Sequence, residues 1–213
     1  MGIRDVLLRE FGYEEPIVAN NMGEQAFGMS RDSLRRSMNR LVARKELARF
    51  AEGIYYFPKW SELLQQETLL SERVVIERKY VEDKNKRYGY FSGGTFANQI
   101  QLTTQVPYVQ EIVTMKCASK KRNVTLKVTQ LLLRKPRVPI TPDNYKVLQV
   151  LDLLTEHLAF VEVDRKEMNE KVREYLADVT LSSDEVIRII SEYPSKTSKE
   201  LLESGLLDAL IRK

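Results

Sequence analysis

The hydrophobic positions of the first sixty residues form short stripes separated by polar turns. Between residues 3 and 11, Ile3, Val6, Leu7 and Phe11 recur at the spacing of one helical face, which predicts a first amphipathic helix. Residues 16–18 fit a short connecting strand, and residues 22–28 form a short segment that ends in a turn at residues 29–30. These elements lead directly into the strongest pattern in the chain.

A second amphipathic helix is predicted from residue 31 to residue 45. Apolar side chains recur there at i, i+4, i+7 and i+8, so one stripe faces a core. Ser30 is a suitable N-cap because its hydroxyl can accept a hydrogen bond from a backbone N–H two or three residues later. The opposite face carries Asp32, Arg36, Asn39 and Arg40, flanked by Arg35 and Arg44. From residue 31 to residue 49 there are seven basic and two acidic residues, a local charge of +5.

A β-hairpin is predicted to follow this basic helix. Residues 47–50 and 54–57 form its strands, Gly53 supplies the backbone freedom of a tight turn, and Pro58 ends the second strand. We expect Tyr55 and Phe57 to pack on the helices as alternate side chains of a half-buried strand, while the place of Tyr56 stays open.

Helix, turn, basic helix and hairpin in this order predict a winged helix-turn-helix within residues 1–65. Such units place the second helix in the DNA major groove and the hairpin over a phosphate. We therefore expect double-stranded operator DNA as a partner. The expected groove contacts are Arg31, Arg35, Arg36, Asn39 and Arg40, and the expected phosphate contacts are Ser30, Arg44 and Arg49. The alternative is a solvated helix face without a ligand.

The rest of the chain, residues 66–213, is expected to form one α+β domain with a helical C-terminal segment. Residues 71–80 read as a helix, residues 92–94 as a turn, and residues 95–102 as a short helix that Thr95 caps. Residues 109–115 and 124–129 alternate as paired strands do. A proline-rich connector precedes a long helix that opens at residues 141–143 with Pro142 in its first turn. Two or three further helices are predicted, at residues 164–179, 183–193 and 198–211.

Charge is unevenly distributed along the chain. The protein has 213 residues and a net charge of +4, yet residues 115–139 alone carry +8 and residues 140–213 carry −5. Such a basic block attracts polyanions, and its loop is expected at residues 119–123. Its members are Lys116, Lys120, Lys121, Arg122, Lys127, Arg134, Lys135 and Arg137. We favour an extension of the DNA contact, because the winged helix alone offers few phosphate contacts. One alternative is a protein-interaction module, in which this block binds an acidic protein and the winged helix is only a scaffold. The others are an RNA-binding factor and a block that is merely solvated.

Composition indicates the class of protein. No apolar run approaches the ~18–20 residues of a membrane span, and the N-terminus leads into an amphipathic helix rather than a signal peptide. The single cysteine, Cys117, excludes an intrachain disulfide, is expected to be buried, and fits a reducing cytoplasm. We therefore expect a cytoplasmic protein without membrane association.

The segment from Tyr90 to Pro107 carries a family resemblance. It reads Tyr-Phe-Ser-Gly-Gly-Thr-Phe-Ala-Asn-Gln-Ile-Gln-Leu-Thr-Thr-Gln-Val-Pro, and Lys-Arg-Asn-Val-Thr-Leu follows further on. This resembles the AbiEi-type antitoxin family, whose members show a Ser-Gly-x-x-Ala-x-Asn-x-Leu-like segment before Thr-Gln-Val-Pro; Ile100 stands here where leucine is more usual. The hairpin ending Gly53-Ile54-Tyr55-Tyr56-Phe57-Pro58 is similar to that of their winged helix.

The resemblance covers roughly residues 1–160, and the helices after Asp164 match no family pattern. It implies an N-terminal domain that represses its own operon in a type IV toxin–antitoxin system. It also implies a C-terminal domain that counteracts a co-encoded nucleotidyltransferase-like toxin, with or without direct contact.

No catalytic or metal-binding constellation stands out, so we expect neither enzyme activity nor a cofactor. The Ser92-Gly93-Gly94-Thr95 run is similar to the Gly-Ser loop of nucleotidyltransferases, but the next acidic residue, Glu111, stands alone where a Mg²⁺ site needs a pair of carboxylates. The only histidine, His157, lies among leucines and is expected to be a structural or surface residue rather than a base. One histidine and one cysteine forty residues apart give no zinc spacing. The oligomeric state is open.

Overall fold

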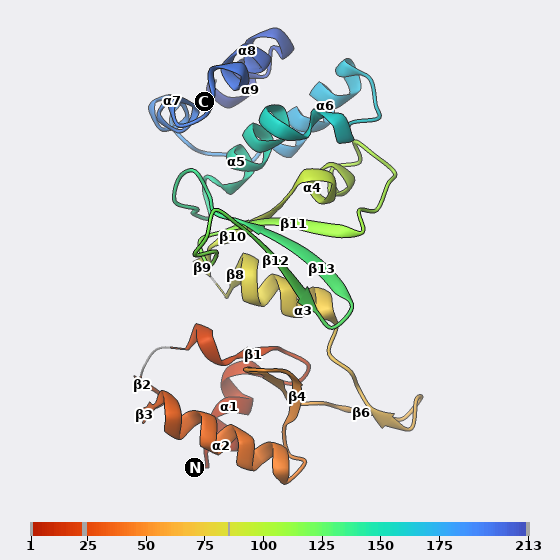
Figure 1. The fold of residues 1–213 in the computed structure, drawn as a ribbon, viewed down its shortest axis with the longest axis vertical. Helices are drawn as coiled ribbons and strands as arrows, with labels where there is room; N and C mark the ends of the chain where they lie inside the picture. The colour runs from red at the N-terminus through yellow and green to blue at the C-terminus, as the bar shows by residue number, and fades with distance from the viewer. Residues whose placement is uncertain (1, 23–24, 85, 212–213) are drawn as a thin grey trace. The chain divides into compact units, whose positions relative to one another are not determined.

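A computed structural model describes residues 2–22, 25–84 and 86–211, and it has the predicted α+β character (Figure 1). The chain divides into two compact units, residues 1–79 and 80–213. The sequence suggested a boundary after residue 65. The difference arises because the segment that follows the hairpin, including a short helix, counts with the first unit.

The first unit contains two principal helices and a three-stranded sheet. The helices are α1 (Ile3–Phe11) and α2 (Arg31–Ala43), and the sheet has the order β1 (Ile17–Val18), β5 (Ile54–Tyr56), β4 (Ala48–Ala51). The short elements are η1 (Ala19–Asn21), β2 (Gln25–Ala26), β3 (Met29–Ser30), β6 (Trp60–Ser61), β7 (Gln66–Glu67) and α3 (Glu72–Ile76). All sheet pairs are antiparallel.

The hydrophobic pattern of this unit builds its core as predicted. Leu7 of α1, Met38 of α2 and Phe57 after β5 are almost completely buried and belong to one cluster. Ser30 caps α2, since its Oγ accepts a hydrogen bond from the Ser33 backbone N–H at 3.3 Å. Tyr56, left open by the sequence, is buried, and its hydroxyl donates to the Thr68 backbone oxygen at 3.4 Å.

The segment before α2 differs from the prediction. Residues 29–30 form β3 rather than a turn, and they pair with β2. The turn lies at Phe27 and Gly28, which both adopt positive φ angles of 57° and 70°. Gly23 and Glu24, which belong to the predicted segment 22–28, lie outside the described residues.

The second unit is built on a four-stranded sheet in the order β10 (Gly89–Ser92), β11 (Val109–Thr114), β13 (Thr129–Arg134), β12 (Lys121–Leu126). The strands β11 and β13 are parallel, whereas the other neighbours are antiparallel. The hairpin β8 (Glu82–Asp83) and β9 (Lys86–Arg87) precedes the sheet, after η2 (Glu77–Val81), which crosses the division between the units.

The predicted pairing of residues 109–115 with 124–129 is therefore wrong. The sequence missed β13, which lies between the two, and the predicted basic loop at residues 119–123 is largely strand β12. The hairpin turn lies instead at Lys127 and Val128, between β12 and β13. As the edge strand, β12 carries charged side chains that protect its open side, so its first half lacks the alternating apolar residues that mark a strand.

Helices cover one face of this sheet (Figure 1). The helices α4 (Gly93–Gln99) and α5 (Tyr145–Asp152) pack on it, and η3 (Leu153–His157) and η4 (Leu158–Phe160) continue α5. The helices α6 (Arg165–Tyr175), α7 (Ser183–Ser191), α8 (Ser195–Ser204) and α9 (Leu207–Ile211) lie beyond these, farther from the sheet. Leu102, Val147, Leu151, Val172 and Val186 form the centre of one core cluster.

Three helix boundaries differ from the sequence prediction. The helix α4 begins at Gly93 after the N-cap Ser92, so Thr95 lies inside the helix and does not cap it. Pro142 precedes α5, which begins at Tyr145. The predicted last helix is two helices, because Gly205 ends α8 in the left-handed conformation with φ 66°.

Candidate functional site

The solvent face of α2 is rich in arginines that have no acidic partner among the residues that the structure describes. Arg31, Arg35, Arg36, Arg40 and Arg44 are exposed, as is Arg49 on β4. Among the described residues, none of them forms an ion pair with a carboxylate, whereas Arg73, Arg87 and Arg165 each pair with a glutamate. An unneutralised guanidinium cluster of this kind suits an anionic partner.

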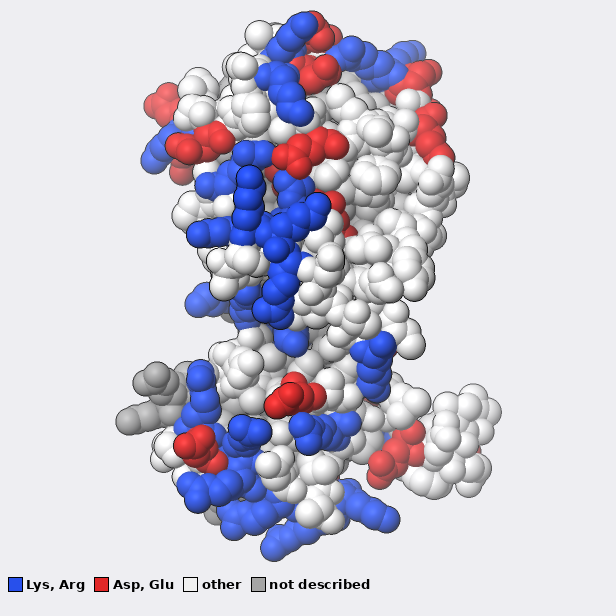
Figure 2. Space-filling model, viewed as in Figure 1, with Lys and Arg blue, Asp and Glu red and all other residues white. Residues whose placement is uncertain are grey.

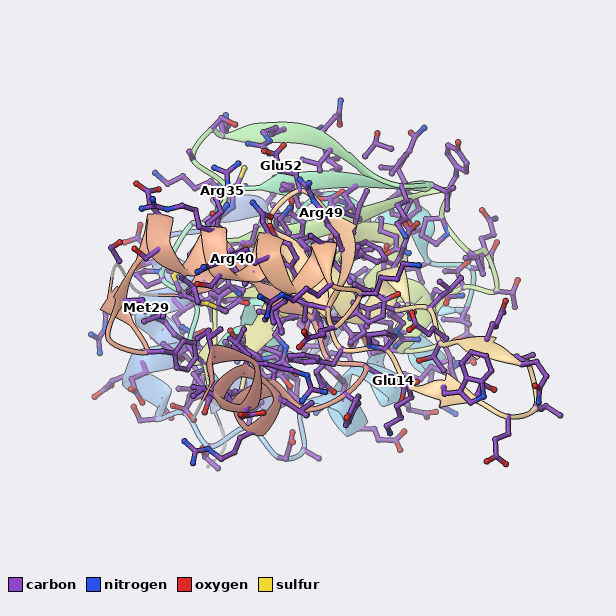
Figure 3. All side chains as sticks on the ribbon, turned by 90° about the horizontal axis from the view of Figure 1, so that it is seen from below. Glu14, Met29, Arg35, Arg40, Arg49 and Glu52 are labelled. Atoms are coloured by element: carbon purple, nitrogen blue, oxygen red, sulfur yellow. The ribbon has the colours of Figure 1, made fainter. Side chains whose placement is uncertain are left out.

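The predicted contact residues divide between two sides of α2. Arg31, Arg35 and Asn39 face the hairpin, and with Arg49 they line a hollow of about 420 Å³ whose other wall is Glu52, Gly53 and Tyr55. Figure 3 shows Arg35, Arg49 and Glu52 along the same side of α2, away from Arg40. Arg36, Arg40 and Arg44 lie outside this hollow.

Hydrogen bonds orient several of these side chains. The hydroxyl of the buried Tyr55 donates to Asn39 Oδ1 at 3.2 Å, which leaves the Asn39 amino group on the solvent side. Arg40 Nη2 donates to Ser37 Oγ at 3.2 Å, and Arg36 Nε to the Asp32 backbone oxygen at 3.4 Å. Arg49 makes one long contact to the Ala51 backbone oxygen, 3.5 Å away. The guanidinium groups retain further N–H donors for a ligand.

The basic block of residues 116–137 is not one surface. Figure 2 shows lysines and arginines gathered in a band on the second unit. Five cations line one hollow of about 700 Å³, namely Lys120, Lys121, Arg134, Lys135 and Arg137. Lys116 lies outside it and sits over the Tyr88 ring at 3.8 Å. Arg122 and Lys127 also lie outside it.

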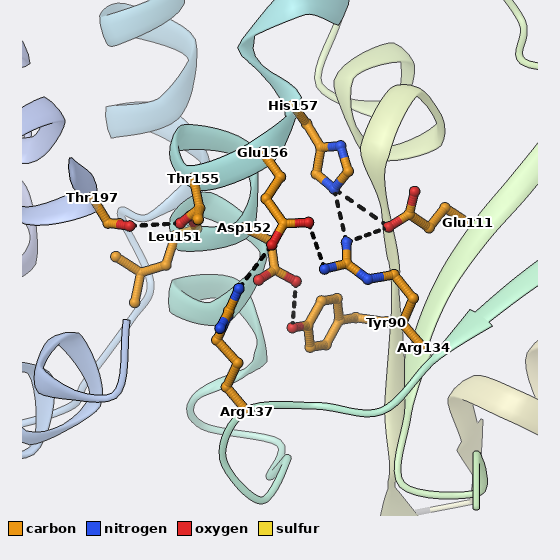
Figure 4. A network of polar contacts seen from close by, with 10 residues as sticks. All are labelled: Tyr90, Glu111, Arg134, Arg137, Leu151, Asp152, Thr155, Glu156, His157 and Thr197. Carbon is orange, nitrogen blue, oxygen red and sulfur yellow. Dashed lines mark hydrogen bonds and ion pairs between the residues drawn. The ribbon is translucent and has the colours of Figure 1, made fainter. Parts of the chain in front are cut away.

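The floor of this hollow is a network of ion pairs (Figure 4). Arg134 donates from Nη1 to Glu111 Oε1 and from Nη2 to Glu156 Oε2, both at 2.6 Å. Arg137 Nη2 donates to the second oxygen of Glu156 at 2.7 Å, and His157 Nε2 lies 3.3 Å from Glu111 Oε1. The two carboxylates are thus occupied by the two arginines.

A second layer lies beneath this network. The buried Asp152 accepts a hydrogen bond from the Tyr90 hydroxyl at 2.8 Å. Burial raises the pKa of Asp152, and the Tyr90 hydrogen bond and the positive charge of Arg134 offset only part of that rise. Burial also opposes ionisation of Glu111, but hydrogen bonds from His157 and Arg134 outweigh it and lower the pKa of Glu111.

This cluster was not predicted from the sequence, where Glu111 stands alone and His157 is expected to be a structural or surface residue. His157 is indeed buried, yet it contacts Glu111 and Arg134. The one signal in the sequence is the spacing of two acids. Glu156 follows Asp152 by four residues, which places both on one helical face, and His157 comes next. Across the described ranges, no group of histidine, cysteine, aspartate and glutamate side chains could hold a metal ion.

Cys117 and the lengths of the helices bear on the expectation of a cytoplasmic protein without membrane association. Cys117 is buried, as expected, and its Sγ lies 3.1 Å from the Ser119 backbone oxygen. In the part of the chain that the structure describes, every helix is too short or too polar to cross a membrane.

Comparison with known proteins places the chain in a family. Residues 24–179 match a family of unknown function, DUF6088. The chain belongs to this family. The match includes α2, the hairpin, the four-stranded sheet and α6. It covers the whole lining of the second hollow, and the lining of the first except Ala19, Asn20 and Met22. DUF6088 carries no described activity, and no curated protein matches the chain.

Proposed function

We propose that this protein is a sequence-specific DNA-binding regulator that contacts duplex DNA through α2 and the β4–β5 hairpin. The single observation that carries the proposal is the solvent face of α2, where exposed arginines lack acidic partners in the described residues. Arginine and asparagine are the side chains that best form paired hydrogen bonds to guanine and adenine edges. The helix that precedes the hairpin is the element that winged-helix proteins insert into the major groove.

The predicted contact residues have two roles in this proposal. Base edges are read from both sides of α2, by Arg31, Arg35 and Asn39 at the hairpin side and by Arg36 and Arg40 away from it. Ser30, Arg44 and Arg49 contact phosphates at the ends of the helix and on the hairpin. Phosphate contacts set the register, whereas base contacts carry the sequence preference.

The test is a binding titration of the full chain with the DNA upstream of its own gene and with random DNA of the same length. Alanine at Arg35, Arg36 or Asn39 should in each case reduce the binding free energy for the preferred DNA by ~1–3 kcal/mol. It should also reduce the preference for this DNA over random DNA. Arg44→Ala and Arg49→Ala should weaken both DNAs alike. Arg9→Ala on α1 is the matched control, because Arg9 is also exposed but lies on another helix. Full preference in the Arg36→Ala/Asn39→Ala protein would remove α2 from the interface.

The resemblance to AbiEi-type antitoxins adds a biological role to this proposal. The first unit would repress its own operon, and the second unit would counteract a co-encoded nucleotidyltransferase-like toxin in the cytoplasm. The chain itself would not be an enzyme. The Ser92–Pro107 segment and the Gly53–Pro58 hairpin ending support this role.

Co-expression tests the antitoxin role separately from DNA binding. The full chain should restore growth of cells that express a nucleotidyltransferase-like protein encoded beside it. Arg36→Ala/Asn39→Ala should still protect, because the second unit is unchanged. Loss of protection in that variant would assign toxin control to the first unit and contradict this division of roles. If α2 instead bound an acidic protein, Arg36→Ala/Asn39→Ala would bind DNA with the same affinity as the unmodified protein.

A further inference from the structure

The hollow of the second unit collects positive charge on one face of the sheet. In the strand register, Lys121 of β12 lies opposite Arg134 of β13, and Arg134 lies beside Val113 of β11. Residues that are directly opposite share a face, so Lys121, Arg134 and Glu111 point to the same side. Arg122, the neighbour of Lys121, points to the other side.

The loops at the end of the β12–β13 ladder add two more lysines. The backbone N–H of Lys135 donates to the backbone oxygen of Lys120 at 3.2 Å, so these residues lie side by side where the strands end. Both line the hollow with Lys121. Among the described residues, no carboxylate pairs with the ammonium groups of these three lysines.

The charges of the hollow do not cancel. Five cations line it (Lys120, Lys121, Arg134, Lys135 and Arg137) against the three acids Glu111, Asp152 and Glu156, which leaves a surplus of two positive charges. Glu111 and Glu156 hold the two arginines through the 2.6 and 2.7 Å contacts, and Asp152 lies beneath them against Tyr90. The surplus therefore resides on the three lysines, beside this ion-pair network.

The size and lining of the hollow indicate the kind of ligand. About 700 Å³ is in the range of small-molecule sites rather than of an extended duplex. The apolar lining consists of Val113, Ala118 and Pro136, and the one aromatic ring among the described lining residues is the buried imidazole of His157. The hollow therefore offers no wide aromatic platform for a base. Recognition must then depend on the charged group of the ligand.

We propose that this hollow binds the phosphomonoester group of a phosphorylated ligand. Such a group carries a charge of about −1.5 to −2 at neutral pH and presents three acceptor oxygens, which matches the surplus of two charges and three lysine ammonium groups. A phosphodiester carries a single charge and balances the site less well. The source is either a small phosphorylated molecule or the phosphorylated end of a nucleic acid strand.

The test is calorimetric titration of the full chain with adenosine 5′-monophosphate, adenosine and inorganic phosphate. Saturable binding of the two phosphates, and none of adenosine, is expected. A second pair of titrations uses a short single-stranded oligonucleotide with a 5′-phosphate or a 5′-hydroxyl. If the 5′-phosphate strand binds more tightly than adenosine monophosphate, the source is a nucleic acid end; if it binds no better, the source is a small molecule.

A pair of variants assigns the binding to the hollow. Lys121→Gln/Lys135→Gln should weaken phosphate binding at least tenfold. Arg122→Gln/Lys127→Gln removes the same charge outside the hollow and should leave binding within about twofold, because distant exposed charges contribute little. Thermal melting checks that both proteins fold. The proposal is overturned if both variants bind phosphate equally well, or if adenosine binds as well as its monophosphate. It is also overturned if binding of the 5′-hydroxyl strand depends on Lys121 and Lys135 as much as binding of the 5′-phosphate strand does.

Discussion

Glu52, at the tip of the β4–β5 hairpin, opposes the proposed DNA contact. It lines the same hollow as Arg35 and Arg49, as does Asp32 of α2. A carboxylate there repels a phosphate and reduces the positive potential of its neighbours. Glu52→Gln should therefore raise the affinity for random DNA, by at most about fivefold, since an exposed charge pair is worth about 0.2–1 kcal/mol.

The measurement is a binding titration at two salt concentrations, because the gain should shrink as salt screens the charges. Glu62→Gln, in the exposed loop between β6 and β7, removes the same charge away from α2 and serves as the control. An unchanged or lower affinity of Glu52→Gln would indicate that the hairpin does not approach DNA.

The buried acids of the second unit should give opposite pH dependences. The raised pKa of Asp152 means that its contribution to stability is present below the ordinary aspartate pKa and is lost as pH rises through the raised value. The lowered pKa of Glu111 means that its contribution is present above the ordinary glutamate pKa and is lost as pH falls. The thermal midpoint of Asp152→Asn should therefore increase relative to that of the unmodified protein as pH rises from about 4 to 8. The thermal midpoint of Glu111→Gln should fall furthest below that of the unmodified protein at the upper end of this range. Melting curves that stay parallel for all three proteins would contradict both assignments.

At the scale of elements, the turn from β10 into α4 depends on one glycine. Gly93 has a φ of +59°, and a Cβ there would lie 3.0 Å from Glu111 Oε2. Gly93→Ala should cost about 1–3 kcal/mol for the left-handed backbone, in addition to displacing Glu111 from Arg134. Gly94→Ala is the control, since its added Cβ would meet only the half-exposed Phe160 ring at 3.3 Å. Chemical denaturation measures the difference, and equal stability of the two variants would show that the turn does not require glycine.

The sequence predicted those elements whose signals are local. The helix α2 has an apolar stripe and a capping serine, and the β4–β5 hairpin has Gly53 and Pro58, so both were found. The strand β13 was missed because Leu131, Leu132 and Leu133 form a continuous apolar run rather than an alternating one. A parallel neighbour such as β11 leaves no turn signal in the sequence, so the strand order could not be read from it.

The two candidate sites were predictable to different degrees. The exposed face of α2 follows from helical periodicity alone, which correctly placed its arginines on the solvent side. The floor of the second hollow joins Glu111, Arg134 and Glu156, which are far apart in the chain and meet only through the sheet register and the end of α5. No local pattern reveals such a contact, and the helical spacing of Asp152 and Glu156 is common in solvated helices.

At the scale of the whole molecule, each unit carries a basic surface of its own. In the first unit it is the α2 face, and in the second it is the lysine-lined hollow. Two proposals about the second surface make different predictions for DNA binding. If its lysines lengthen the DNA contact, they release counterions when DNA binds. If they hold a phosphomonoester, they contribute little to duplex binding.

The salt dependence of duplex binding distinguishes these proposals. The slope of log K against log salt becomes shallower by ~0.9 for each phosphate interaction that a substitution removes. Arg44→Ala/Arg49→Ala should therefore reduce the slope by ~1.8, because both arginines are expected to contact phosphates. Lys121→Gln/Lys135→Gln removes the same charge from the second unit and should leave the slope and the operator preference unchanged, since these lysines face a hollow too small for a duplex. A reduction of the slope in the lysine variant equal to that in the arginine variant would instead assign the hollow to the DNA footprint.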